Sequence, residues 1–516
     1  MRPVTRVSLW IVAIFILAWG SYLRAWNLGD KIFWRDEAWV ATLAQQPWSV
    51  VLNQTDVPCP PLFAGAVKLT SVVKPPEVGL RLLPVLCGIA LLPLAYAAVR
   101  ALRLPRMMAL AGMALCAGSF MLANWSRELK QYPIEAFLSV AAAVLTFRLW
   151  QAGGKKRLPE TAGLALICLV GPWLAYGVVF ALLPLLAVLI FLPSPTPGRP
   201  RLGRQGLACL LILGVSLGTV VTHVAAKQSS NLALLDYTSH WFIKPASAMS
   251  WLRAGAYGMH TSAMLILPDV IGMDPSEMHP AVLALGIGVW LLALAGLWAW
   301  PARTRWAMAF WTVGPWLVMY AAAVAQRYPF GMPRMMSIVA PGTLLAAAAG
   351  AAAAFRWLTL TVAGRPAVGL ALALAAAMVP MVRLSDLPSN RRYWIRHDFP
   401  AVLNELQARR QSDEPVLVDV TATPVVRYYW AGRDEDFDYV ETSGGTLVPL
   451  NFDYERFLEP ILARNPRKIW LLTSSHEKPE LSECLRKHNW SFGEPAARAG
   501  GNIFGEALLY SLVPRR

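Results

Sequence analysis

Two adjacent acids, Asp36 and Glu37, are the residues of this chain best suited to chemistry. They stand in the Trp-rich stretch KIFWRDEAWV at 31–40, directly after the first long apolar segment. A carboxylate beside a bound hydroxyl can take its proton while the oxygen attacks another group. Acids are costly near hydrocarbon and are kept mainly where they act. We therefore interpret the pair as a candidate catalytic centre. Asp36 could also cap a helix over 37–46, and both roles can hold at once.

Two short segments further along the chain carry cations that could hold an anion. Arg127 and Lys130 precede Tyr132 in one segment, and Arg327 and Arg334 share the other. Both segments follow apolar runs. An Arg side chain offers paired donors to phosphate oxygens, so we predict phosphate binding by these cations. The alternative is that the long side chains extend to lipid headgroups.

A third acid, Asp56, belongs to the same loop as the acid pair and precedes a Pro-rich turn at 57–62. We predict that it binds substrate. The later loop at 227–280 holds His240, His260 and His279, but their spacing is not that of a metal site. We expect no metal ligands among these residues and no defined cofactor, and leave a divalent metal open.

The composition is that of a membrane protein. Of 516 residues, 56% are hydrophobic and 22 are Trp, and the mean hydropathy is +0.44. Apolar runs of about 17–25 residues, the length that crosses a bilayer, recur along the chain. We predict eleven spans at 7–26, 80–99, 107–124, 132–149, 161–175, 178–193, 205–226, 281–300, 307–325, 335–355 and 367–384.

The net charge of +16 would suit nucleic acid, but its distribution argues against such a partner. The basic residues cluster in alternate short loops, which is the pattern of cytoplasmic loops. Those loops carry Arg2, Arg6, Arg100, Arg103, Arg106, Arg148, Lys155, Lys156, Arg157, Arg199, Arg201, Arg204, Arg303, Arg305, Arg356 and Arg365. We therefore expect a multi-pass protein of the bacterial inner membrane, with a cytoplasmic N-terminus and, after an odd number of spans, an extracytoplasmic C-terminus.

The distribution of acidic residues along the chain indicates two domains. Only 12 of the 31 Asp and Glu residues precede position 385, and the last 132 residues have ordinary soluble composition. We predict a polytopic α-helical membrane domain at 1–384, with long outward loops at 27–79 and 227–280. A small extracytoplasmic α/β domain follows at 385–516, because candidate strands at 415–419, 468–473 and 507–511 alternate with candidate helices at 398–410 and 424–430.

At these positions the chain resembles the GT-C membrane glycosyltransferases of the family 39 type, which includes protein O-mannosyltransferases and lipid A aminoarabinose transferases. FWRDEAW at 33–39 is similar to the family's Asp-Glu motif, and CPPL at 59–62 to its His-Pro-Pro element. SRELKQY at 126–132 and RYPFGMPR at 327–334 are similar to two later family segments. The largest departure is Cys59, where the family usually has His.

The resemblance implies a GT-C-like fold and a polyprenyl-phosphate-linked sugar donor, with inversion at the sugar carbon. It also implies transfer to an extracytoplasmic glycan, lipid or protein. By the same likeness Asp36 is the general base, and Glu37 either supports it or binds donor or acceptor. Arg127, Lys130 and Arg327 hold the lipid phosphate.

Two other classes of function are open at this stage. A transporter or flippase for a lipid-linked glycan would favour internal repeats and charge in mid-bilayer, and neither is visible in the sequence. A non-catalytic scaffold in polysaccharide assembly would leave Asp36, Arg127 and Arg327 without a purpose.

Overall fold

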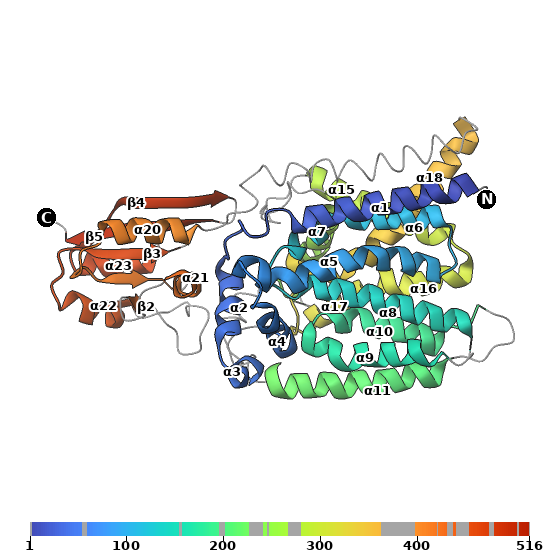
Figure 1. The fold of residues 1–516 in the computed structure, drawn as a ribbon, viewed down its shortest axis with the longest axis horizontal. Coiled ribbons are helices and arrows are strands. Elements are labelled where there is room, and N and C mark those ends of the chain that lie inside the picture. Colours follow the sequence, from blue (N-terminus) through green and yellow to red (C-terminus); the bar gives the residue numbers. More distant parts are fainter. Residues whose placement is uncertain are drawn as a thin grey trace.

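The computed structural model describes residues 3–53, 59–153, 157–195, 202–225, 241–244, 247–266, 280–362, 398–419, 422–430, 437–439, 454–473, 479–502 and 505–514. Figure 1 shows a bundle of long helices beside a smaller domain of strands and helices. The two parts meet at one end of the bundle. Three short helices lie at that end: α2 (Arg35–Gln45), α3 (Trp48–Asn53) and α4 (Pro61–Thr70).

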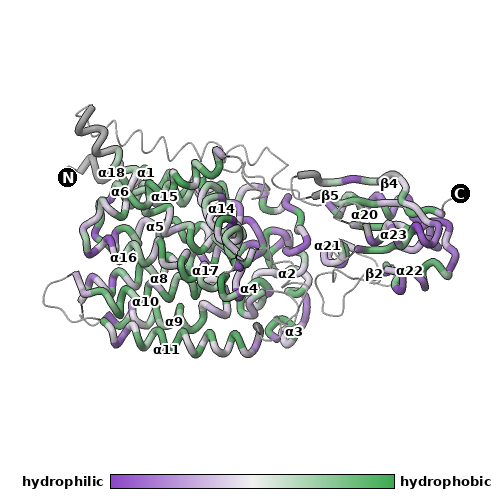
Figure 2. Tube along the Cα trace, turned by 180° about the vertical axis from the view of Figure 1, so that it is seen from behind, coloured by the Kyte–Doolittle hydropathy of each residue, from purple (hydrophilic) through white to green (hydrophobic). Residues whose placement is uncertain are grey.

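Long apolar runs form the helices of the bundle because a helix satisfies all its backbone hydrogen bonds internally, as a lipid environment requires. Figure 2 shows these helices as mainly hydrophobic. They are α1 (Pro3–Ala25), α5 (Pro76–Ala101), α6 (Arg106–Gly118), α7 (Phe120–Ser126), α8 (Tyr132–Ala152), α9 (Leu158–Leu174), α10 (Val178–Phe191), α11 (Gly203–Val220), α14 (Ala248–Met264), α15 (Pro280–Ala299), α16 (Ala302–Thr312), α17 (Gly314–Val324) and α18 (Ala340–Val362). A π-helical turn, η1 (Val221–Ala225), extends α11, and a 3₁₀ segment, η4 (Pro333–Val339), precedes α18.

The predicted spans between residues 7 and 355 all coincide with helices or helix pairs. Within the described residues, six helices are long and apolar enough to cross a membrane, and a seventh crossing is reached if the bent pair α6–α7 is one span. The break predicted inside 161–193 is present, between α9 and α10. The last predicted span, 367–384, lies outside the described residues, so the count of eleven stays a prediction.

Small residues bring α15 and α18 into close contact. A β-carbon added at Gly296 would overlap the backbone of Ala346, and one added at Gly350 would overlap the backbone of Leu292. The small residues of the alanine-rich stretch at 346–354 therefore allow close helix packing.

The C-terminal domain is a mixed α/β fold, as predicted. Its sheet has the strand order β2-β1-β3-β5-β4, in which β2, β1 and β3 are parallel and β5 runs antiparallel to both β3 and β4. The strands are β1 (Val416–Val418), β2 (Asp438–Tyr439), β3 (Ile469–Thr473), β4 (Trp490–Asn502) and β5 (Gly505–Pro514), and the helices are α20 (Phe399–Arg409), α21 (Thr423–Tyr429), α22 (Tyr454–Leu462) and α23 (Pro479–Lys487).

Strand β4 was not predicted, because its sequence WSFGEPAARAGGN has neither regular alternation nor an apolar run. The proposed domain boundary at 384–385 lies outside the described residues. Helix α21 packs against α2, so the C-terminal domain contacts the loop that carries the acid pair.

Candidate active site

The acid pair is buried at the start of α2, at the end of the bundle that faces the C-terminal domain (Figure 1). Asp36 is the second residue of α2 and does not cap it, so the capping interpretation of Asp36 was wrong. The helix begins at Arg35 after Trp34, whose backbone N–H donates to Glu37 Oε2 at 3.4 Å. The carboxylate that accepts a backbone hydrogen bond at the N-terminus of α2 is therefore that of Glu37, not that of Asp36.

Glu37 is held on all sides. Arg81, near the start of α5, donates from Nε to Oε1 and from Nη2 to Oε2, both at 2.8 Å. The backbone N–H of Leu129 donates to Oε1 at 2.7 Å. Burial raises the pKa of Glu37, but Arg81 and Lys31 outweigh that effect and the pKa of this carboxyl lies below its usual value. With its lone pairs so occupied, Glu37 is suited to anchoring the loop rather than to moving a proton.

Asp36 points to a different set of partners. Arg334 Nη1 donates to its Oδ2 at 2.6 Å, and Arg35 Nε donates to its Oδ1 at 3.3 Å. Burial raises the pKa of Asp36, but Arg334, Lys130 and Arg35 lower it by more, so the carboxyl lies below its usual pKa. Three cations thus surround one carboxylate, and this group has an excess of two positive charges.

Lys130 is the cation of this group with spare donors. Its side chain is 4% exposed, and within the described part of the chain its ammonium makes no hydrogen bond or ion pair. Burial lowers the pKa of Lys130, while the neighbouring Asp36 raises it. A buried ammonium without a bonded partner is costly, so this position is suited to an anion.

The other predicted residues take different positions. Arg127 is buried and donates from Nη2 to the Trp26 carbonyl at 2.5 Å; burial and the nearby Arg81 lower its pKa to about 9. Tyr132 is buried at the start of α8, and its carbonyl accepts a hydrogen bond from Ser337 of η4 at 3.2 Å. This contact joins the Lys130 segment to the element that carries Arg334.

Arg327 is not part of the buried group, because it is exposed in the segment that follows α17. Asp56 lies outside the described residues. His260 is buried on α14, and the other two histidines of the 227–280 loop lie outside the described residues. Among the residues that the structure describes, no cluster of three or more His, Cys, Asp or Glu could hold a metal ion.

Sequence reasoning missed two buried ion pairs beneath the site. Arg81 pairs with Glu37, and Lys31 Nζ lies 3.4 Å from Glu128 Oε1. All four side chains are at most 2% exposed. The available signal for Arg81 was a single cation at the start of an otherwise apolar span, since such residues are rare unless they have a partner.

The C-terminal domain reaches the same loop through one aromatic cluster. The Tyr429 hydroxyl of α21 accepts from the Phe33 backbone N–H at 2.9 Å, and the Phe33 ring packs edge-on against Tyr428. The Arg81 guanidinium lies 4.5 Å from the centre of the Phe33 ring. The C-terminal domain therefore supports the residue that holds Glu37.

The structure is similar to crystal structures of ArnT from Cupriavidus metallidurans. In the apo state the TM-score is 0.56 at 14% identity, covering 98% of this chain and 97% of ArnT. In the state bound to undecaprenyl phosphate the TM-score is 0.54 at 13% identity, covering 99% and 98%. The oligosaccharyltransferase of Archaeoglobus fulgidus, in its apo form, gives a TM-score of 0.49 at 12% identity, covering 90% and 69%. No protein-family model and no curated protein matches the sequence.

The chain has a GT-C fold. This fold is a helical membrane bundle with a C-terminal domain, and the match with ArnT extends over nearly the whole of both chains. At this identity the likeness establishes the fold, while the reaction must be argued from the residues of the site. Helix α2, which carries Asp36, lies at the end of the bundle that faces the C-terminal domain and packs against α21 (Figure 1).

Proposed function

We propose that the protein is a membrane glycosyltransferase that moves a sugar from a polyprenyl-phosphate donor to an extracytoplasmic lipid, glycan or protein acceptor. The observation that carries this proposal is the excess of positive charge around Asp36, with Lys130 buried and free to bind. A phosphate brought to Lys130 and Arg334 would neutralise that excess by charge-assisted hydrogen bonds. The acceptor hydroxyl would then meet a sugar held beside a carboxylate.

The proposed reaction is a single displacement. The acceptor oxygen attacks the anomeric carbon of the sugar, and the bond from that carbon to the phosphate oxygen breaks, with inversion. The hydroxyl proton passes to Asp36, and the electron pair of the broken bond leaves with the polyprenyl phosphate. Because a phosphate leaves readily, placement of the two substrates supplies a large share of the rate increase.

Arg334 links donor binding to the strength of the base in this scheme. In the structure it binds Asp36 Oδ2 and helps to hold the pKa of that carboxyl low, which makes Asp36 a weak base. If Arg334 turns to the donor phosphate, Asp36 loses its closest cationic partner and its pKa rises. The base would thus gain strength only when the donor is present.

The fold supports the choice of donor. The ArnT structure with the same fold holds undecaprenyl phosphate, a polyprenyl phosphate. In the proposal the bundle helices bind the isoprenoid chain and the site at their end binds the phosphate. Glu37 anchors α2, and Arg127 and Tyr132 contribute to substrate binding. Asp56 is assigned to substrate binding from the sequence alone.

Lys130→Met should weaken binding of a polyprenyl-phosphate sugar about 10- to 100-fold, because a charge-assisted hydrogen bond contributes about 1.5–3 kcal/mol. Titration of the purified protein with the donor measures the effect. Lys74→Met is the matched control, since Lys74 is exposed between α4 and α5. Equal donor affinities for wild type and Lys130→Met would refute the phosphate site, and no sugar transfer with any polyprenyl-phosphate donor would refute the reaction.

Arg327→Ala should also weaken donor binding, by less than Lys130→Met, because an exposed cation acts on the phosphate through screened attraction. The effect should shrink as salt is raised from low to physiological concentration. Donor titrations at two ionic strengths measure it. An affinity that is unchanged at low salt would remove Arg327 from the phosphate site and leave it as a headgroup contact.

The site and the C-terminal domain should lie outside the cytoplasm, with the N-terminus inside. A reporter that is active only in the periplasm, fused after residue 516, should be active, and one active only in the cytoplasm should be silent. The physical basis is the set of basic residues in alternate loops. The reverse result would mean that the number of spans is even, and the outward placement of the Arg327 segment would be wrong as well.

A further inference from the structure

The end of the bundle opposite to Asp36 carries a second concentration of positive charge. Helix α5 connects the two ends, since Arg81 near its start binds Glu37 and Arg100 lies near its end. Nineteen residues of helix separate them, which is about 30 Å at 1.5 Å per residue. This length equals the thickness of the hydrocarbon core of a bilayer, so the two charged regions belong to opposite membrane surfaces.

Arginines from two connections converge on one cavity at this far end. The cavity has a volume of about 530 Å³. Its arginines are Arg100, Arg103, Arg106, Arg148 and Arg157. Arg157 is paired with Glu160 at 2.7 Å. In the described part of the chain, Arg103, Arg106 and Arg148 have no carboxylate within ion-pair distance. The cavity therefore holds uncompensated positive charge and suits an anion.

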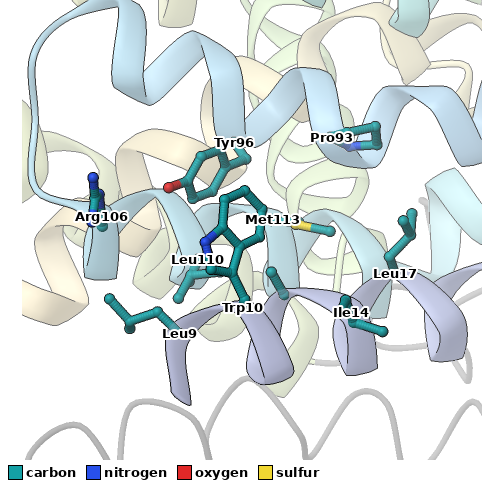
Figure 3. A pocket seen from close by; sticks show the side chains of 10 residues that line it. Leu9, Trp10, Ile14, Leu17, Pro93, Tyr96, Arg106, Leu110 and Met113 are labelled. Carbon is teal, nitrogen blue, oxygen red and sulfur yellow. The ribbon is translucent and has the colours of Figure 1, made fainter. Parts of the chain in front are cut away.

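An apolar cavity adjoins the basic one. It has a volume of about 170 Å³ and lies between α1, α5 and α6. Figure 3 shows Trp10, Ile14 and Met113 around it, with Arg106 at one side and the Tyr96 hydroxyl pointing toward that side. Tyr96 and Arg106 line both cavities. The two spaces thus form one site with an apolar part and a cationic part.

We propose that this pair of cavities binds an anionic glycerophospholipid, with its phosphate among the arginines and an acyl chain between α1, α5 and α6. A free anion would need only the basic cavity, whereas a lipid uses both. The apolar part opens toward the bilayer, because Trp10 and Ile14 are 68% and 63% exposed on α1. Charge complementarity favours an anionic headgroup over a zwitterionic one. The site is separate from the proposed donor site by the length of α5.

The charged half of the site is tested with the purified full-length protein in detergent after removal of bound lipid. Dioleoylphosphatidylglycerol should bind at least 10-fold more tightly than dioleoylphosphatidylcholine, measured by native mass spectrometry. Arg103→Gln/Arg106→Gln/Arg148→Gln should remove this preference. The control is Arg303→Gln/Arg305→Gln, which should keep it: Arg303 donates to the Pro195 carbonyl at the same end of the bundle and does not line the cavity.

The apolar half is tested by Ala13→Phe, which fills the smaller cavity and leaves every arginine in place. In this variant the affinity for dioleoylphosphatidylglycerol should fall at least 10-fold. In the wild type, inorganic phosphate should compete only weakly with this lipid. Three results would overturn the proposal: equal affinity for the two lipids, an unchanged preference in the triple variant, or a loss in the triple variant without any loss in Ala13→Phe. The last result would assign the basic cavity to a free anion. Retained melting temperatures show that the variants are folded.

Discussion

Replacing Asp36 with Asn will lower sugar transfer by about 10²–10⁴-fold, the usual loss when a general base is removed. The amide keeps the shape of the side chain but cannot take the acceptor proton. Donor binding should be retained or slightly tighter, because the substitution removes one negative charge from a group that already has an excess of positive charge. Initial rates at saturating donor, together with a donor titration, measure both quantities.

Asp30→Asn provides the matched control, since Asp30 belongs to the same loop and is exposed. It should transfer sugar at a rate close to that of the wild type. A folded Asp36→Asn protein that keeps more than half of the wild-type turnover would exclude Asp36 as the base. A loss of donor affinity with little change in turnover would instead place Asp36 in donor binding.

Replacing Arg81 with Met will destabilise the protein by about 3–5 kcal/mol, because it leaves the buried Glu37 carboxylate without its cation. Both side chains of this pair are fully buried, and Arg81 also binds the backbone carbonyl of Leu28 at 3.2 Å. Thermal unfolding in detergent should therefore show a clear decrease in melting temperature. The segment that Glu37 anchors at the start of α2 would also become less ordered around Asp36, so the rate of sugar transfer should fall as well.

The double variant Arg81→Met/Glu37→Gln separates charge from shape. Its neutral amide oxygen can still accept from the Leu129 N–H, as Glu37 Oε1 does, so it should regain a large part of the lost stability. If the double variant is no more stable than Arg81→Met, the unpaired carboxylate is not the cause of the loss. If it regains stability and also transfer, Glu37 positions the loop and is not itself the base.

The elements of the site were predictable from local signals. Apolar runs predicted the helices, and the break between α9 and α10 was recognisable from Gly171 and Pro172 near the end of α9 and from Gly177 after it. Charge at the ends of those runs indicated Asp36, Lys130 and Arg334, which the structure brings together. Strand β4 was missed because it is defined by its pairing with β5, which no local pattern reports.

The different roles of the two adjacent acids were not predictable from the sequence. Asp36 and Glu37 have the same chemistry and are adjacent, but successive side chains on a helix point about 100° apart. Asp36 therefore points to Arg334, and Glu37 points to Arg81. Their partners lie 298 and 44 positions along the chain, so nothing near the motif could reveal which acid is anchored.

The sequence alone determined that this protein is a helical membrane protein with an α/β domain, because hydropathy and charge act through local composition. It also determined which segments carry candidate acids and cations. Only the tertiary structure decided which cations are bonded to groups of the protein and which are exposed or have donors left over. Arg127 is engaged by the Trp26 carbonyl, Arg327 is exposed, and Lys130 is buried beside Asp36. Burial and pairing depend on distant segments packed together, and this packing distinguishes residues of the same type.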